Sequence, residues 1–300
     1  MKICRLLPMV LLATLLMSCG REQGYRDNIP DAVIPEGYTL VWNDEFDGDV
    51  LNLDKWYIEE NGRGGGNNEL QFYDSRGVSV GEEPESGRNC LILTARKGYY
   101  RGRTASSGRV NTSRSYTFTH GRVEALIRLP NTANGLWPAF WLLGEDINKV
   151  GWPRCGEIDI MEMGHVDGIN NFKQNTYFNG AAHWGYFDQT GYPNKATMLD
   201  APYSLQDGFH LYTLEWDEKQ LRGYLDLNLD PDAEPFFELD IDDYSDDRAA
   251  GHYFHHPFFI VLNLAVGGNF TGIWDIDKVT ALSLGEQSMY VDYVRVYQRI

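Results

Sequence analysis

Apolar and polar side chains alternate with a period of two along much of this chain, and this pattern constrains the fold more than any other feature. Between residues 122 and 129 apolar residues occupy every second position, and residues 209–216 repeat the pattern. No segment beyond the N-terminal apolar stretch keeps apolar residues on one helical face over three turns. Such alternation is typical of half-buried strands, and the apolar run 258–266 is typical of a strand covered on both sides. The sequence predicts an all-β protein, and its 300 residues fit one large domain.

Three carboxylates interrupt an otherwise apolar run at residues 156–164, which read GEIDIMEMG. Burying several ionised carboxylates side by side is costly unless they face a solvated cleft or a cation. In a regular strand Glu157 and Asp159 would share one face, and Glu162 would point to the other. A β-bulge between Asp159 and Glu162 adds one residue and brings all three acids to one face. Because bulges often lie next to active sites, we expect a bulged strand with a catalytic face.

Paired carboxyl groups about 5–5.5 Å apart suit the hydrolysis of glycosidic bonds with retention of configuration. In that reading Glu157 attacks the anomeric carbon, and Glu162 protonates the leaving oxygen and later activates water. Asp159 between them orients Glu157 and tunes its charge. Two alternatives stay open from the motif alone. The acids could bind Ca²⁺, or they could belong to a solvent-facing edge strand that needs no bulge.

Five segments resemble, in the right order, landmarks of glycoside hydrolase family sixteen. They are WPAFWLL at 137–143, VGWPRCGEIDIMEMG at 150–164, FHLYTLEW at 209–216, HPFFIVLNLAVGGN at 256–269 and MYVDYVRVYQ at 289–298. The spacing E-x-D-x-x-E is similar to that of the laminarinase-like branch, and the resemblance covers about residues 36–300. It implies a concanavalin A-like β-jelly-roll sandwich of two antiparallel sheets with a concave cleft. It also implies Glu157 as nucleophile, Asp159 as assisting acid and Glu162 as acid/base.

The resemblance implies a retaining endo-β-glucanase that acts on β-1,3-glucan (laminarin) or on mixed-linkage β-1,3/1,4-glucan. Two rivals remain: an agarase-, porphyranase- or carrageenase-type hydrolase of the same family, and a glucan-binding surface lectin without activity. Paired acids argue against the lectin, because binding alone does not need them. No cofactor is expected for catalysis.

Substrate-binding candidates come from aromatic and polar residues near these motifs. The spacing of four between Trp137 and Trp141 points both indoles to one side of a strand, and the resemblance places the pair in the cleft. Trp152 is a third candidate for stacking on sugar. Asn68, in GGNNELQFY, and His183 are candidate polar ligands, although a turn former and a structural histidine are the alternatives.

Many members of the family hold a structural Ca²⁺ away from the cleft. Glu45 in NDEFDG and Asp292 in YVDYVRVY match the positions of its acidic ligands. Carboxylate oxygens suit Ca²⁺, but an ion pair would explain Asp292 equally well. A structural calcium site at these two residues is therefore an expectation that follows from the resemblance.

The N-terminus predicts an exported lipoprotein. Lys2 and Arg5 precede an apolar stretch at 6–17 that is too short to span a bilayer and resembles a secretory signal. The stretch ends in LMSC at 16–19, which resembles a bacterial lipobox, so Cys19 would be lipidated. This divides the chain into a signal peptide (1–18), a lipidated tether (19–35) and a catalytic domain (36–300). Gly20 in place of Asp favours the outer membrane or cell surface, and an ordinary signal peptide is the alternative.

Charge and cysteine content limit the partners further. The chain has 43 acidic and 26 basic residues and a net charge of −17, which disfavours polyanionic partners such as nucleic acid but not a neutral β-glucan. We expect a monomer. Cys90 and Cys155 remain in the domain as buried thiols or, less in keeping with a large β domain, as a disulfide. No cysteine or histidine spacing indicates zinc.

Overall fold

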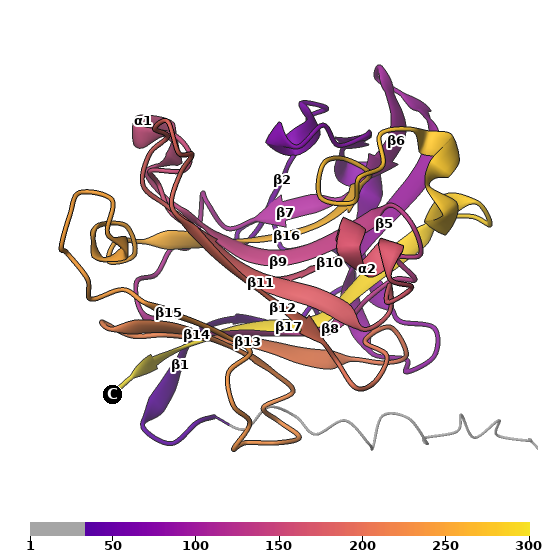
Figure 1. Cartoon of the computed structure of the whole chain (residues 1–300). Helices are drawn as coiled ribbons and strands as arrows, with labels where there is room; N and C mark the ends of the chain where they lie inside the picture. The colour runs from indigo at the N-terminus through magenta and orange to yellow at the C-terminus, as the bar shows by residue number, and fades with distance from the viewer. Residues whose placement is uncertain (1–33) are drawn as a thin grey trace, which may run out of the picture.

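The computed structural model describes residues 34–300, and these form two β-sheets that lie one on the other (Figure 1). The larger sheet has the order β15-β14-β13-β8-β17-β5-β6-β3, with β1 paired to β17 and β4 paired to β5. The smaller sheet has the order β12-β11-β10-β9-β16-β7-β2. Strands β3 and β6 pair in parallel, and all other named pairs are antiparallel. The predicted two-sheet, all-β architecture is confirmed.

The strands of the larger sheet are β1 (Tyr38–Asp44), β3 (Gln71–Tyr73), β4 (Val78–Glu82), β5 (Asn89–Tyr100), β6 (Arg103–Ser107), β8 (Gly121–Arg128), β13 (His210–Trp216), β14 (Gln220–Leu225), β15 (Phe237–Asp240) and β17 (Gln287–Arg299). Those of the smaller sheet are β2 (Tyr57–Ile58), β7 (Arg109–Asn111), β9 (Leu136–Gly144), β10 (Glu157–Met163), β11 (Tyr177–His183), β12 (Asn194–Asp200) and β16 (Phe258–Val266).

Helices in the described part of the chain are short and lie in the connections. The α-helices are α1 (Ile147–Val150) and α2 (Val166–Asn170), and the 3-10 turns are Gly64–Gly66, Ser75–Gly77, Ala250–His252, Ile276–Lys278 and Thr280–Leu282. Between residues 34 and 300, no helix has the length and apolar character needed to cross a membrane.

The hydrophobic core fills the space between the sheets, because each strand turns its apolar face toward the other sheet. In β8, Val123, Ala125 and Ile127 are buried in this core, as the alternation predicts. Strand β16 is buried along its whole length and pairs with β9 on one side and β7 on the other. This confirms the central strand predicted from the apolar run 258–266.

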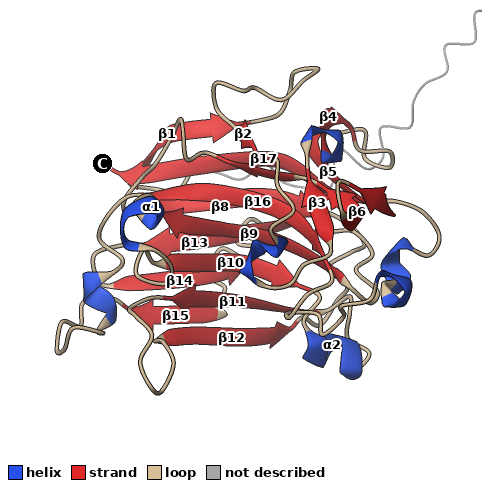
Figure 2. Cartoon of the chain, turned by 90° about the horizontal axis from the view of Figure 1, so that it is seen from above, coloured by secondary structure: helices blue, strands red, loops and turns tan. Residues whose placement is uncertain are grey.

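The smaller sheet has a second face that points away from the core, and we call it the outer face. Figure 1 shows this sheet curving between the α1 loop at one end and β6 at the other. Figure 2, seen from above, shows that strands of the two sheets run in similar directions, as in an aligned sandwich.

Two predictions concern cysteines. Cys90 and Cys155 are free, buried thiols, so the alternative of a disulfide between them is wrong. The signal peptide, Cys19 and all but the last two residues of the tether lie outside the described residues.

Candidate active site

Strand β10 carries the three predicted carboxylates and contains the predicted bulge. Asp159 and Glu162 are three positions apart in β10, but their partners in β11 are only two positions apart. Ile160 and Met161, which lie between them, are both buried in the core. Glu157, Asp159 and Glu162 consequently all belong to the outer face. The bulge expected between Asp159 and Glu162 is confirmed, and the register of β10 against β9 is shifted at the same place.

Directly paired residues of neighbouring strands share a face, so the register gives the neighbours of each acid. The pairs on the β11 and β9 sides are His183 and Leu143 for Glu157, Ala181 and Trp141 for Asp159, and Asn179 and Ala139 for Glu162. Ala139 and Ala181 thus place small side chains beside Glu162 and Asp159. The site therefore consists of acids in a row with a histidine at one end and an asparagine at the other.

Glu162 is held by two hydrogen bonds and is only 8% exposed. Trp137 Nε1 donates to Oε1 at 2.9 Å, and Asn179 Nδ2 donates to Oε2 at 2.9 Å. Burial, and then the nearby charge of Asp159, raise the pKa of Glu162 to about 8, although both hydrogen bonds work in the opposite direction. Glu162 is therefore protonated at neutral pH, as a general acid must be.

Glu157 and Asp159 share the other end of the row with His183. Burial, and then the charge of Asp159, raise the pKa of Glu157, while the nearby imidazole of His183 lowers it. Burial likewise raises the pKa of Asp159. His183 Nε2 lies 3.3 Å from Asp159 Oδ2. Two acids so close do not both ionise readily, so a proton shared within this group fits its chemistry.

The same three side chains could also hold a metal ion by spacing alone, because their ligand atoms lie within 4.8 Å of one another. No other group with this spacing occurs between residues 34 and 300. Two carboxylates and one imidazole could bind several divalent metals, and paired carboxyl groups on one face also suit acid–base chemistry.

The two tryptophans of β9 lie on the outer face but have different environments. Trp137 is 8% exposed, and its ring stacks on Phe270 with centroids 4.5 Å apart. The expectation that Trp137 stacks on a sugar does not fit this geometry, because Phe270 covers the ring and Glu162 takes its N–H. Trp141 is partly exposed and donates from Nε1 to Asn263 Oδ1 at 2.7 Å. Its position beside Asp159 fits the expected contact with substrate.

The other predicted binding residues lie toward the two ends of the site. Trp152 is 40% exposed, and its ring centroid is 6.1 Å from that of His183, at the Glu157 end. Asn68 is exposed and donates from Nδ2 to Asn269 Oδ1 at 3.1 Å. The same oxygen accepts from Trp274 Nε1 at 3.1 Å, so Asn68 belongs to a polar group of its own and not to the acid row.

Sequence reasoning missed several residues of the site. Asn179 and Asn263 each lie in a strand and bind a residue of the outer face through a side-chain hydrogen bond. Tyr192 lies in the connection between β11 and β12, with its ring 5.7 Å from that of His183. The two asparagines could have been predicted, because each is a polar residue inside an otherwise apolar strand. Nothing local marked Tyr192.

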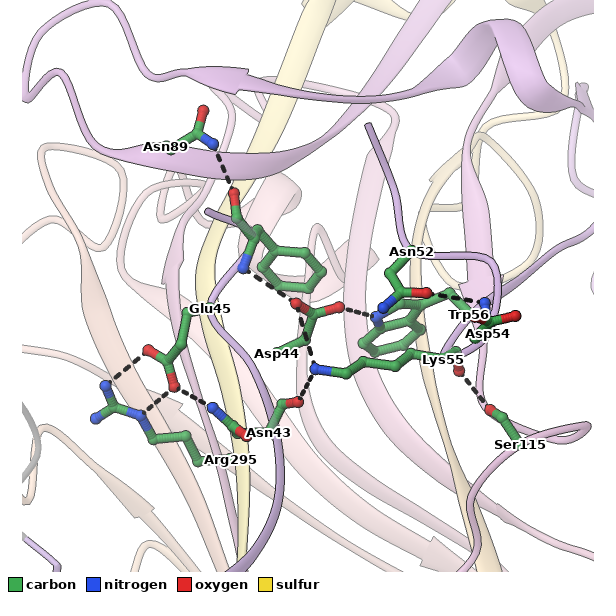
Figure 3. A network of polar contacts seen from close by, with 11 residues as sticks. Asn43, Asp44, Glu45, Asn52, Asp54, Lys55, Trp56, Asn89, Ser115 and Arg295 are labelled. Carbon is green, nitrogen blue, oxygen red and sulfur yellow. Dashed lines mark hydrogen bonds and ion pairs between the residues drawn. The ribbon is translucent and has the colours of Figure 1, made fainter. Parts of the chain in front are cut away.

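The predicted calcium ligands lie where β1 ends against β17, and each carboxylate binds an arginine. Arg295 donates to both oxygens of Glu45, at 2.9 and 2.8 Å, and Asn43 donates to one of them at 2.9 Å (Figure 3). Arg88 binds Asp292 at 2.5 Å, with both side chains largely buried. The two acids thus belong to separate ion pairs.

A neighbouring group of oxygens also has a protein partner. The side-chain amide of Asn89 donates to the backbone oxygens of Phe46 and Gly48, at 2.7 and 2.8 Å (Figure 3 shows the first). A calcium site needs several oxygens that converge on one point. Because guanidinium and amide donors occupy these oxygens, the residues present do not fit the expected calcium site.

Comparisons with known proteins give consistent results. The model of "Glycosyl hydrolases family 16" matches residues 72–230. A beta-glucanase of Rhodothermus marinus is 33% identical, over 87% of this chain and 85% of that protein. The GH16 protein of the Bacteroides ovatus mixed linkage glucan PUL, solved with a G4G4G3G product, is 38% identical, with a TM-score of 0.73 over 85% of this chain and 99% of that one. The laminarinase catalytic domain of Thermotoga maritima is 31% identical, with a TM-score of 0.71 over 88% of this chain and 100% of that one.

Proposed function

The chain belongs to glycosyl hydrolase family 16 and is a β-glucanase, and we propose that it cuts internal bonds of its glucan with Glu157 as nucleophile and Glu162 as acid/base. The observation that carries this assignment is the bulge of β10, which holds both acids on the outer face with Asp159 between them. A retaining mechanism is general for the family, and it needs one ionised and one protonated carboxyl group.

In the first step Glu157 attacks the anomeric carbon of a glucosyl residue. The bond from that carbon to the glycosidic oxygen breaks, and Glu162 gives its proton to the departing oxygen. The product is an ester between Glu157 and the sugar. The raised pKa of Glu162 supports its part in this step, because it keeps the proton available at neutral pH.

In the second step water hydrolyses the ester. Glu162, now ionised, takes a proton from water as the water oxygen attacks the anomeric carbon, and the bond to Glu157 breaks. Asp159 assists by holding the proton of this pair, so that Glu157 attacks as a carboxylate, and by donating a hydrogen bond to Glu157 as its charge returns. Their proximity and the imidazole of His183 beside Asp159 support this role.

We propose β-1,3-glucan or mixed-linkage β-1,3/1,4-glucan as the substrate. The relatives named above are a beta-glucanase, a laminarinase and a protein of a mixed linkage glucan PUL. The net charge of −17 supports a neutral polymer over a sulfated one, because polyanions would be repelled. Product profiles on laminarin, barley β-glucan, lichenan and agarose decide the point. Release of oligosaccharides from agarose alone would overturn the proposal.

Glu157→Gln tests the role of the nucleophile. We expect turnover to fall by at least about 10³-fold while binding of glucan stays nearly unchanged, because the amide cannot form the ester but keeps the shape of the site. Hydrolysis rates and affinity electrophoresis on the same preparation measure both quantities. Turnover close to that of the unmodified enzyme would remove Glu157 from the mechanism.

We further propose that Cys19 is lipidated and anchors the protein to the outer membrane or the cell surface, and that the protein is a monomer. The lipobox-like LMSC at 16–19 supports the anchor. A surface location would place the site where a large polysaccharide can reach it.

A further inference from the structure

Three aromatic side chains gather beside the Glu157 end of the acid row, and we call them the aromatic wall: Trp152, Phe187 and Tyr192. Trp152 precedes β10, and the other two lie in the connection between β11 and β12. Trp152 is 40% exposed and Phe187 is 60% exposed. Large apolar side chains that cluster on the surface next to a functional site often mark a binding surface.

The rings of the wall contact one another mostly edge to face. Tyr192 lies at the centre, with centroids 4.8 Å from Trp152 and 5.0 Å from Phe187. Its ring is also 5.7 Å from that of His183, which is paired with Glu157 across the sheet. The nearby charges of Glu157 and Asp159 add to burial in raising the pKa of Tyr192. The wall is thus continuous with the acid row.

A second loop fastens the connection that carries Phe187. Arg248, in the loop between β15 and β16, forms an ion pair with Asp188 and donates to the backbone oxygen of Gly191 at 3.1 Å. Asp188 also accepts from the backbone N–H and the hydroxyl of Thr190, at 2.7 Å each. These contacts fix the turn immediately after Phe187.

Two further contacts join the same loops. Tyr186 donates from its hydroxyl to Asp247 at 2.8 Å, and Trp184 Nε1 donates to the backbone oxygen of Arg248 at 2.8 Å. Phe187 is therefore exposed in a turn that is held on both sides. A fixed and exposed aromatic ring loses little conformational freedom on binding, which favours contact with a flat apolar ligand surface.

We propose that the aromatic wall stacks on a glucosyl ring of the bound glucan beside Glu157, with Phe187 as the main contact and Arg248 as its positioning residue. The inference rests on the proposed function. A β-linked glucose ring presents a face of C–H groups, which packs on an aromatic ring, and its hydroxyls can reach the polar edge of Tyr192. Because the wall is neutral, it selects the shape of a glucan chain and not its charge.

The test uses Phe187→Ala in the Glu157→Gln protein, with calorimetric titration of laminarin- and barley-derived oligosaccharides. We expect roughly five- to tenfold weaker binding of long oligosaccharides, and Phe187→Tyr should restore most of the loss. Phe172→Ala is the matched control, because Phe172 is 88% exposed beyond the opposite end of β11. Equal affinities of Phe187→Ala and Phe172→Ala for every oligosaccharide would overturn the proposal.

Arg248→Ala tests the positioning role. We expect the loss of affinity in Arg248→Ala to be no greater than the loss in Phe187→Ala. The double variant should bind as weakly as Phe187→Ala alone, because both substitutions act through the same ring. Fully additive losses would show that Arg248 acts independently of Phe187. These outcomes are separable from failure of the proposed function, which would appear as absence of β-glucan hydrolysis by the unmodified enzyme.

Discussion

Glu162 shows how single residues set the chemistry of this site. Burial and the charge of Asp159 raise its pKa to about 8, and the hydrogen bonds from Asn179 and Trp137 restrain that rise. The same two bonds hold the carboxyl group at both oxygens. Burial thus keeps the acid protonated, and residues of two neighbouring strands fix the direction of its carboxyl group.

The raised pKa of Glu162 predicts the pH range in which activity declines on the alkaline side. The protonated form of Glu162 is the active one, so kcat/KM should fall as pH rises through about 8. Asn179→Ala removes a bond that favours the ionised form, which raises the pKa of Glu162 and moves the alkaline limb to higher pH. Profiles of kcat/KM for both proteins measure the shift. Movement of the limb to lower pH would contradict the electrostatic account.

At the residue scale the sequence predicted the acids but not their partners. Three carboxylates in an apolar run are visible locally, and their spacing implied the bulge. Trp137 was predicted to stack on sugar from its spacing to Trp141 and from the resemblance, and neither could show that Phe270, which is distant in the sequence, stacks on its ring. Of the aromatic wall, only Trp152 was predicted. Phe187 and Tyr192 follow β11, and they come near Glu157 only because β11 pairs with β10.

At the scale of elements, the acidic residues and backbone oxygens where β1 ends against β17 have protein donors as partners. Arg295 binds Glu45, Arg88 binds Asp292, and Asn89 binds two backbone oxygens of the loop after β1. The resemblance predicted calcium here because acidic residues occupy matching positions. It could not reveal that arginines lie within reach of both.

Calcium removal is therefore predicted to have little effect on stability. We expect the melting temperature in EDTA and in millimolar CaCl₂ to agree within about 1 °C, because arginine and amide donors already occupy the oxygens that would bind the ion. Differential scanning calorimetry at constant ionic strength measures this, with MgCl₂ as the control for salt. A rise of several degrees that is specific to Ca²⁺ would mean that the ion displaces the arginines.

At the scale of the whole molecule, the two-sheet fold was predictable because alternation and five ordered motifs agree with each other. The pairing of β10 with β9 and β11 was not, because register depends on segments far apart in the chain. The N-terminal predictions lie outside the described residues and depend on the sequence alone.

Lipidation predicts how the full chain partitions. Full-length protein from its host should enter the detergent phase with the membrane fraction, whereas Cys19→Ala should be soluble, since it lacks the acyl chains. Detergent-phase extraction followed by immunoblotting measures the partition. Equal solubility of the two proteins would leave an ordinary signal peptide as the explanation of residues 1–18.

The stereochemistry of the first product tests the central claim most directly, that Glu157 and Glu162 act by double displacement on one face of β10. Proton NMR of a fresh hydrolysate of laminarin or barley β-glucan, recorded before mutarotation, identifies the anomer that is released. The account predicts the β-anomer, because two inversions at the anomeric carbon restore the configuration of the substrate. Initial release of the α-anomer would contradict it, since Glu157 would then activate water as a base and form no ester with the sugar.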